Sequence, residues 1–498
     1  MIHKKDTATF SDYLLDNSGL PAGSAEEIAF PETAAEVAEL LRQCRNDARP
    51  VTIAGAGTGI VGGRIPCGGV ILASDRLNRI LQINRSVDKA GGWAVIEPGV
   101  RLEELSVAAA SQGLAYPPDP TEKKAFLGGT VATNASGARG FKYGATRRYV
   151  RALGVALIGG DILELRRGER FLRGQADLDL VSGARVCFSV PTYQLPVVKN
   201  AAGYYAGEGL DLIDLFIGQE GTLAAVTRIE VDLVPLAQGV CSGLAFFHDE
   251  AAALSYVAAV QEISRSDQAK SAARINASCL EYFDERSLAI LRERYHQIPR
   301  AAAAVYFDQE NTAAAELDIM TAYSDLLARF GALDNDIWFA STEQQRGLLA
   351  GIRYDLPVMI NERVKRNGFA KLSTDIAVPQ RAFAVFFAYM KTQLQETAVP
   401  YAVFGHIGES HLHLNLMPET AAAFRAAQAL YRRLLVKAIE LRGTIAAEHG
   451  IGKLKQQYLG LMFGDDGVAQ MRQIKRAFDP QWLLGRGTMF EVPKDGIY

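Results

Sequence analysis

The sequence predicts an α+β protein of two or three domains. Its 498 residues are too many for one ordinary hydrophobic core. Short runs rich in β-branched residues and separated by glycine fill the chain up to about residue 236, which is typical of short strands and tight turns. After Pro235, alanine-rich stretches predict helices with a few strand-like pieces between them. We therefore expect a glycine-rich first domain and a second domain with more helix.

The first domain begins with a predicted helix and strand. Residues 31–48 predict a helix that Pro31 can start. Its apolar face contains Val37, Leu40, Leu41 and Cys44. VTIAG after Pro50 predicts a strand, and a short helix is expected at 101–112. Further strands are predicted by GGVILAS, WAVIEPGV, LGVALIGG and GTLAAVTRIEVDLVP.

The second domain is expected to mix helices with a few strands. Periodic or alanine-rich stretches predict helices at 249–265, 312–330 and 421–442, and Gly443 can end the last of them. AAAVYFD and GFAKLSTDIAVP predict strands between these helices.

Composition excludes several classes of protein. The net charge is −3 and no long basic run occurs, so nothing supports a nucleic-acid-binding surface. Five scattered cysteines without a Cys-x-x-Cys pair argue against a disulfide or zinc-finger scaffold and fit a reducing compartment. The N-terminus is too polar for a signal peptide, and no apolar run reaches the roughly eighteen residues that a membrane span needs. We expect a cytoplasmic protein without a transmembrane segment, and peripheral association with the inner face of the membrane stays open.

A glycine-rich loop follows the first predicted strand. Residues 55–63 read GAGTGIVGG, and Gly57, Gly59 and Gly62 match the G-x-G-x-x-G pattern of dinucleotide-binding proteins. A Rossmann fold requires a helix at the last glycines, but the continuation GGRIPCGG cannot sustain one. What remains is either a loop whose backbone N–H groups wrap a diphosphate or a plain connection with several turns.

A second segment favours the ligand-binding interpretation. Residues 117–144 read PPDPTEKKAFLGGTVATNASGARGFKYG. The segment is rich in glycine and in small hydroxyl or amide side chains and has almost no bulky aliphatic residues. A core segment would not have this composition, whereas a groove lined by backbone for a nucleotide would.

Histidines gather in the C-terminal part of the chain. Four of the seven lie there, namely His406, His411, His413 and His449, and Glu448 directly precedes the last of them. Two imidazoles and a carboxylate form a metal-ligand set that leaves positions open for a substrate. A further histidine beside such a set is a candidate base.

Together these segments resemble one known family. GAGTGIVGG, PPDP, GGTVATNASGARGFKYG, KNAAGY, GQEGTLAAVT, GHIGESHLHLN, EHGIGK and FDPQWLLGRGTMF occur in the order of the FAD-linked dehydrogenases of D-2-hydroxy acids, within the vanillyl-alcohol-oxidase-type flavoproteins. The resemblance implies an FAD-binding domain of two α+β subdomains at 27–236. It also implies a substrate or cap domain at 237–442, with an antiparallel sheet and flanking helices, and a segment at 443–498 that returns to the flavin.

The family pattern assigns residues to FAD. The diphosphate is expected at Gly55, Gly57, Thr58 and Gly59. The remainder of FAD is expected at Pro118, Asp119, Gly128, Gly129, Thr133, Ser136, Gly137, Tyr143, Glu220, Gly221 and Ile229. No histidine occurs between His3 and His248, which excludes a histidyl link from this domain. We expect non-covalent FAD and no cysteinyl link from Cys67, which lies near the loop.

The resemblance also assigns roles in the histidine cluster. His406, His413 and Glu448 correspond to metal ligands, His449 to the catalytic base and Asn415 to a substrate contact. An α-hydroxy acid can chelate an ion through its hydroxyl and one carboxylate oxygen, and the ion lowers the pKa of that hydroxyl. Histidine can take the proton near neutral pH while hydride passes to the flavin. We expect Zn²⁺, with Mn²⁺ or Fe²⁺ as alternatives.

One part of the histidine cluster departs from the family pattern. Glu409, Ser410 and His411 stand where many relatives have Asp, Gly and Asn. His411 is therefore an extra ligand, a group behind the ligands or a surface histidine. If the segment is a strand, His411 and His413 share one face.

Two cationic residues are candidates for the substrate carboxylate. Arg353 corresponds to a substrate arginine of relatives, and a guanidinium binds a carboxylate through two parallel hydrogen bonds. Lys371 is the second candidate, although its spacing to Asp375 differs from that in relatives.

The resemblance implies oxidation of a D-2-hydroxy acid to its 2-oxo acid. D-lactate is the first candidate substrate, followed by D-2-hydroxyglutarate and glycolate. No nicotinamide motif is evident, so electrons are expected to leave to a quinone, a cytochrome or an electron-transfer flavoprotein. We also expect a homo-oligomer. The alternatives are a flavin-dependent transferase like the alkylglycerone-phosphate synthases and a non-catalytic flavoprotein subunit that relays electrons.

Overall fold

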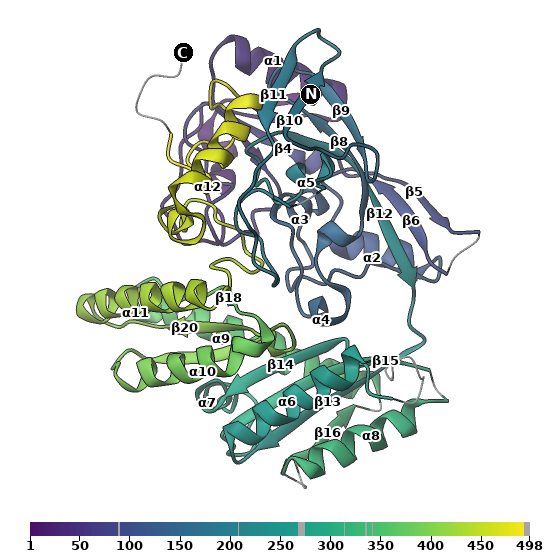
Figure 1. The fold of residues 1–498 in the computed structure, drawn as a ribbon, viewed down its shortest axis with the longest axis vertical. Helices are drawn as coiled ribbons and strands as arrows, with labels where there is room; N and C mark the ends of the chain where they lie inside the picture. The colour runs from purple at the N-terminus through teal and green to yellow at the C-terminus, as the bar shows by residue number, and fades with distance from the viewer. Residues whose placement is uncertain are drawn as a thin grey trace.

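Two lobes make up the protein (Figure 1), for which the computed structural model describes residues 1–87, 90–207, 209–266, 274–312, 314–333, 336–340 and 342–492. The N-terminal half and the C-terminal helix form the upper lobe in this view, and the teal and green middle of the chain forms the lower one. Helices and sheets occur in both lobes, so the predicted α+β class is confirmed. None of the described helices is both long and apolar enough to cross a bilayer.

The first sheet of the upper lobe has the strand order β1-β2-β4-β3. Its strands are β1 (Ile2–Lys4), β2 (Glu27–Phe30), β3 (Val51–Ala54) and β4 (Val70–Ala73). Strand β4 pairs in parallel with β2 and β3, and helix α1 (Ala34–Asn46) makes the crossover between those two. The predicted helix and strand are thus present. Pro31 does not start the helix, because the Thr33 hydroxyl accepts a hydrogen bond from the Glu36 backbone N–H and caps it.

A second sheet of six antiparallel strands completes the upper lobe, in the order β5-β6-β12-β8-β9 with β7 on β12. Its strands are β5 (Ile80–Arg85), β6 (Gly92–Ile96), β7 (Leu114–Ala115), β8 (Val150–Ala156), β9 (Ile162–Arg166) and β12 (Ala225–Pro235). A separate hairpin is formed by β10 (Gln175–Asp179) and β11 (Arg185–Ser189). The helices are α2 (Leu102–Ala110), α3 (Leu127–Thr133), α4 (Gly140–Tyr143) and α5 (Ile213–Phe216). Residues 55–69 form turns without a helix, as expected from the failure of the Rossmann pattern.

The lower lobe is built on one eight-stranded sheet, in the order β16-β13-β15-β14-β19-β20-β17 with β18 on β20. Its strands are β13 (Gly239–Phe247), β14 (Cys279–Asp284), β15 (Ala303–Asn311), β16 (Trp338–Ala340), β17 (Leu372–Ser373), β18 (Ile376–Ala377), β19 (Tyr401–Gly405) and β20 (His411–Leu416). All of the pairings are antiparallel. The helices are α6 (Glu250–Arg265), α7 (Glu285–Leu291), α8 (Glu316–Arg329), α9 (Glu343–Asn367), α10 (Gln380–Gln395) and α11 (Ala421–Glu440).

The three helices predicted for this lobe correspond to α6, α8 and α11. The predicted helix at 312–330 begins later, at Glu316, and its residue 313 lies outside the described residues. Helix α11 ends at Glu440, and Arg442 takes the left-handed conformation with φ of 62°. The helix thus ends before Gly443, which was predicted to terminate it, and Arg442 takes the left-handed position that glycine usually occupies.

The C-terminal segment returns to the upper lobe. Helix α12 (Gln456–Phe478) breaks its regular conformation at Gly464, and its last ring, Phe478, packs against Phe188 and Phe216. Beyond it, the backbone N–H of Val51 in β3 donates to the carbonyl oxygen of Leu483 at 2.8 Å. This return carries residues 441–455, which connect α11 to α12, between the two lobes (Figure 1).

Candidate functional site

A cavity of about 340 Å³ lies beside the glycine-rich loop of the upper lobe. Its walls come from residues within 55–64, 120–137 and 219–226, and Glu448 and His449 also line it. Of the residues expected to hold FAD, its lining contains Gly55, Gly57, Thr58, Gly59, Gly128, Gly129, Thr133, Ser136, Gly137, Glu220 and Gly221. Segments that are distant in the sequence therefore share one wall.

Four residues expected at FAD are not part of this lining. Pro118 is buried, and Asp119 bridges to Gly137 through its backbone. The Tyr143 hydroxyl donates a hydrogen bond to Glu310 of the lower lobe. Ile229 is fully buried in β12, between β6 and β8, so it supports the sheet and not the cavity wall.

The glycines leave the cavity wall open where a dinucleotide would pass. Gly57 has φ of 78° and Gly137 has φ of 100°, values that residues with a side chain rarely adopt. A Cβ atom at Gly59 or Gly129 would meet no described atom within 4 Å. Arg64 adds a cation and donates from Nη1 to the Gly55 carbonyl at 3.1 Å. An open backbone wall beside a cation suits a diphosphate, so the cavity fits a dinucleotide cofactor.

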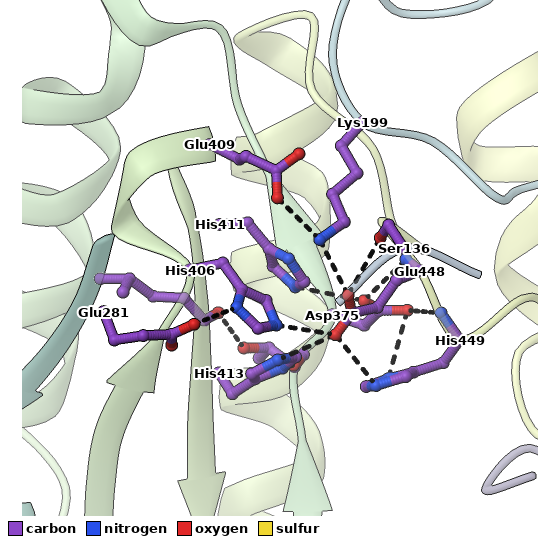
Figure 2. A network of polar contacts seen from close by, with 12 residues as sticks. Ser136, Lys199, Glu281, Asp375, His406, Glu409, His411, His413, Glu448 and His449 are labelled. Carbon is purple, nitrogen blue, oxygen red and sulfur yellow. Dashed lines mark hydrogen bonds and ion pairs between the residues drawn. The ribbon is translucent and has the colours of Figure 1, made fainter. Parts of the chain in front are cut away.

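Three imidazoles and one carboxylate converge beside the cavity (Figure 2). His406 follows β19, His411 and His413 lie on β20, and Glu448 comes from the segment before α12. The Nε2 atoms of His406 and His413 lie 3.2 and 3.3 Å from Glu448 Oε1. One ligand atom from each of the four residues lies within 4.8 Å of the others. That spacing allows a single ion to reach all four groups.

The other ring nitrogens fix the orientation of two imidazoles. His406 Nδ1 lies 2.7 Å from Glu281 Oε1, and His413 Nδ1 lies 3.0 Å from the Thr374 carbonyl oxygen. Such partners turn the opposite nitrogen, Nε2, toward a metal position. Neither Glu281 nor Thr374 is predicted from the sequence. A lone glutamate in the buried strand CLEYFD is the signal that could have revealed the first of them.

Burial and neighbouring charges shift the pKa values of the cluster in different directions. Burial lowers the pKa of His406, but Glu281 and Glu448 outweigh this effect and raise it to about 9. Burial also lowers the pKa values of His411 and His413, which favours the neutral imidazole that binds metals. For Glu448, burial raises the pKa, but Lys199 and His406 hold it well below its usual range. Because His406 must be neutral to bind a metal, binding there would release a proton at neutral pH.

Lys199 and Ser136 hold the second oxygen of Glu448. The Lys199 Nζ lies 2.8 Å from Glu448 Oε2, and the Ser136 hydroxyl donates to the same oxygen at 3.2 Å. Lys199 also lies 3.0 Å from Glu409. Lys199 belongs to the motif KNAAGY, but no role for it is predicted from the sequence. Because Lys199 and Ser136 contact Oε2 of Glu448, its other oxygen, Oε1, faces the imidazoles.

Asp375 positions the residues at 448 and 449. It accepts hydrogen bonds from the backbone N–H groups of Glu448 and His449 and from Lys455 Nζ, at 3.2, 3.0 and 2.7 Å. His449 Nδ1 lies 3.5 Å from Asp375, and His449 Nε2 lies 3.4 Å from Glu448 Oε1. Asp375, His413 and His449 could also share an ion. Since Asp375 already accepts three hydrogen bonds, its role is to orient Glu448 and His449 and not to bind an ion.

The remaining predicted residues differ in their relation to the cluster. Arg353 of α9 is 11% exposed, and its Nε lies 3.3 Å from Glu281, so one carboxylate joins it to His406. Asn415 lies on β20 and donates from Nδ2 to the His413 carbonyl at 3.3 Å. Burial lowers the pKa of Lys371, which has no ion pair or hydrogen bond within the part of the chain that is described. Lys371 is therefore not joined to the cluster.

Glu220 connects the cavity wall to the segment that carries Glu448. Its carboxylate accepts hydrogen bonds from the backbone N–H groups of Ile451 and Gly452, at 2.8 and 2.7 Å. Burial raises the pKa of Glu220 from 4.5 to about 7. Between these pH values the folded protein retains a proton that the unfolded chain has released, so stability falls as the pH rises.

We expect Glu220→Gln to remove this pH dependence. The free energy of unfolding of the original protein should fall by about 3 kcal/mol relative to the variant as the pH rises from 4.5 to 7. Urea unfolding of both proteins across this range measures the difference. Parallel pH profiles would contradict the expectation.

Comparison with known proteins agrees with this geometry. Residues 25–166 match the family model of the FAD binding domain, and residues 240–489 match that of the C-terminal domain of FAD linked oxidases. A D-lactate dehydrogenase of Anaerostipes hadrus is 30% identical over 96% of this chain and 92% of its own length. The glycolate oxidase subunit GlcD of Bacillus subtilis (strain 168) is 29% identical over 93% of this chain and 89% of its own length.

A further relative and a solved structure extend the comparison. A D-2-hydroxyglutarate dehydrogenase of Xanthomonas citri pv. viticola is 29% identical over 93% of this chain and 89% of its own length. A solved alkyldihydroxyacetonephosphate synthase has the same fold, with a TM-score of 0.66 and 17% identity over 97% of this chain and 82% of that one. The two family models span both lobes. The chain therefore belongs to the FAD-linked oxidases.

Proposed function

We propose that the protein oxidises a D-2-hydroxy acid to the 2-oxo acid, with non-covalent FAD and one divalent metal ion. The observation that carries this proposal is the convergence of the His406 and His413 Nε2 atoms on Glu448 Oε1, 3.2 and 3.3 Å away, beside a cavity that suits FAD. His449 lines the same cavity. The proposed base and one proposed metal ligand, Glu448, thus line the cofactor cavity.

The ligands proposed for the metal are His406, His413 and Glu448. Imidazole and carboxylate suit Zn²⁺ first, with Mn²⁺ or Fe²⁺ as alternatives. When bound, the metal lowers the pKa of the substrate hydroxyl and FAD supplies the two-electron acceptor. Glu281 and the Thr374 carbonyl keep two Nε2 atoms pointed at the ion, and Lys199 keeps Glu448 ionised.

His449 is the proposed base. Its side chain is 24% exposed, and Asp375 holds both its backbone and its Nδ1 side. This leaves Nε2 to take the substrate hydroxyl proton. Arg353 is proposed to bind the substrate carboxylate, because its Nε lies 3.3 Å from Glu281, which also contacts His406, and no described residue accepts a hydrogen bond from its terminal nitrogens. Asn415, on the same strand as His413, is a proposed substrate contact.

The proposal also includes a particular substrate and a class of electron acceptor. D-lactate is the first candidate substrate and D-2-hydroxyglutarate the second, because relatives that match most of the chain carry these names. The acceptor is proposed to be a quinone, a cytochrome or an electron-transfer flavoprotein.

An anaerobic titration of the flavin absorbance tests the proposal. D- and L-lactate, D- and L-2-hydroxyglutarate, D-malate and glycolate are added in turn, before and after treatment with EDTA. We expect one D-acid to bleach the flavin rapidly, and we expect EDTA to abolish that reduction until metal is restored. The L-acids serve as matched controls for stereochemistry.

Two results would contradict the proposal. If no acid bleaches the flavin of protein that holds both FAD and metal, the dehydrogenase function fails, and a transferase or an electron-relay subunit takes its place. If a D-acid bleaches the flavin equally well after complete metal removal, the oxidation does not depend on the ligand set.

A further inference from the structure

His411 is a buried histidine without a hydrogen-bond partner. It opens β20 and lies on the same face as His413. Its side chain is 0% exposed, so the surface interpretation is wrong. Neither ring nitrogen has a hydrogen-bond partner among the described residues. Leaving a buried polar group unpaired costs about 1–3 kcal/mol, so we expect a bound group to interact with this ring.

Asp375 lies close to the ring but is a weak hydrogen-bond partner for it. The His411 Nε2 lies 3.3 Å from Asp375 Oδ1, but the two atoms do not have the geometry of a hydrogen bond. Asp375 already accepts hydrogen bonds from two backbone N–H groups and from Lys455. Its carboxylate is therefore satisfied without His411.

The His411 ring stands within reach of the other ligands. Its centroid is 4.5 Å from that of His413 and 5.3 Å from that of His406 (Figure 2). A ligand atom of His411 lies within 4.8 Å of ligand atoms of His406, His413 and Glu448. Four donors at this spacing can surround one ion.

We propose that His411 is a fourth protein ligand, so that the ion is held by three imidazoles and one carboxylate. The inference rests on the proposed function, because it concerns the same metal. A set with three imidazoles selects a transition metal such as Zn²⁺ or Fe²⁺ and disfavours Mg²⁺ and Ca²⁺, which prefer oxygen ligands. The metal would also bind more tightly than at a site with two imidazoles.

X-ray absorption of protein reconstituted with Zn²⁺ counts the coordinated imidazoles. We compare the original FAD-containing protein with His411→Asn and with His413→Asn, which removes a ligand of the proposed function. His296→Asn is the matched control, because His296 is exposed and its ring contacts the Arg292 carbonyl at 3.0 Å. Chelator competition gives the Zn²⁺ dissociation constant of each protein, and FAD content verifies folding.

We expect three imidazoles in the original protein and in His296→Asn, and two in His411→Asn. The Zn²⁺ dissociation constant of His411→Asn should be about 100-fold or more above that of the original protein. Loss of a residue that only supports a metal ligand weakens binding by about 10- to 100-fold, and loss of a ligand should cost at least as much as the upper value. Two imidazoles in the original protein overturn the inference, and this count decides even if the variant does not fold. Three imidazoles in His411→Asn also overturn it, because His449 would then be the third ligand.

The test separates this inference from the proposed function. If His413→Asn loses Zn²⁺ while His411→Asn binds it unchanged, only the role of His411 is wrong. If the original protein binds no Zn²⁺ and His413→Asn behaves identically, the metal site of the proposed function fails together with this inference.

Discussion

Replacing His449 with glutamine should lower kcat by about 10²- to 10⁴-fold, the usual contribution of a general base. The structure explains why this substitution should affect only the proton transfer and not the binding of FAD or metal. Asp375 accepts the backbone N–H of residue 449 at 3.0 Å, and that bond survives the substitution. The nearest approach of His449 Nε2 to Glu448 Oε1 is 3.4 Å, the longest of the three histidine contacts to that oxygen. FAD and metal contents should therefore be retained.

Stopped-flow reduction of the flavin by the preferred acid measures this effect directly. His248→Gln is the control, because His248 is an exposed histidine in the bend between β13 and α6 and belongs to neither group of candidate metal ligands. An unchanged rate in His449→Gln would show that another group accepts the proton. Loss of the metal together with activity would show instead that His449 is a ligand, as in the alternative set with Asp375 and His413.

The sequence predicted helices whose apolar residues recur with the period of a helix. The apolar face of α1 is buried at Val37, Leu40, Leu41 and Cys44, as predicted from the sequence. Helices α9 and α12 were not predicted. Pro357 lies inside α9 and Gly464 breaks the regular conformation of α12, and both residues are strong signals against a continuous helix. In α9, packing within the fold outweighs the preference of Pro357. In α12, Gly464 keeps its non-helical conformation, with φ of 66°, and divides the helix into two parts.

In the candidate site, the sequence predicted the proposed metal ligands but not the groups that support them. The motifs GHIGESHLHLN and EHGIGK drew attention to His406, His413 and Glu448 because they are short and dense in ligand groups. Their supporting groups come from distant segments: Glu281 is 125 residues from His406 along the chain. No local pattern joins such residues, because the antiparallel pairing of β14 with β19 brings them together. The roles of the supporting groups thus depend on the fold.

Replacing Lys199 with methionine should lower the free energy of unfolding by about 3–5 kcal/mol in the metal-free flavoprotein, the usual cost of removing one partner from a buried ion pair. Lys199 is 4% exposed and lies 2.8 Å from Glu448 and 3.0 Å from Glu409. Without it, two buried carboxylates lose their shared cation. Urea unfolding after EDTA treatment measures the loss. Lys437→Met is the control, because Lys437 pairs with Glu440 on the surface and should cost at most about 1 kcal/mol.

The double variant Lys199→Met/Glu409→Gln distinguishes the electrostatic effect from a packing effect. It removes one of the two carboxylates, so part of the lost stability should return, and the cycle with both single variants gives the coupling energy. Added Zn²⁺ should restore more stability to Lys199→Met than to the original protein, because the ion replaces the missing positive charge beside Glu448. If Lys199→Met costs no more than Lys437→Met, or if Glu409→Gln gives no recovery, Lys199 does not balance these carboxylates. Burial of Glu448 as a charged ligand would then depend on the metal ion itself.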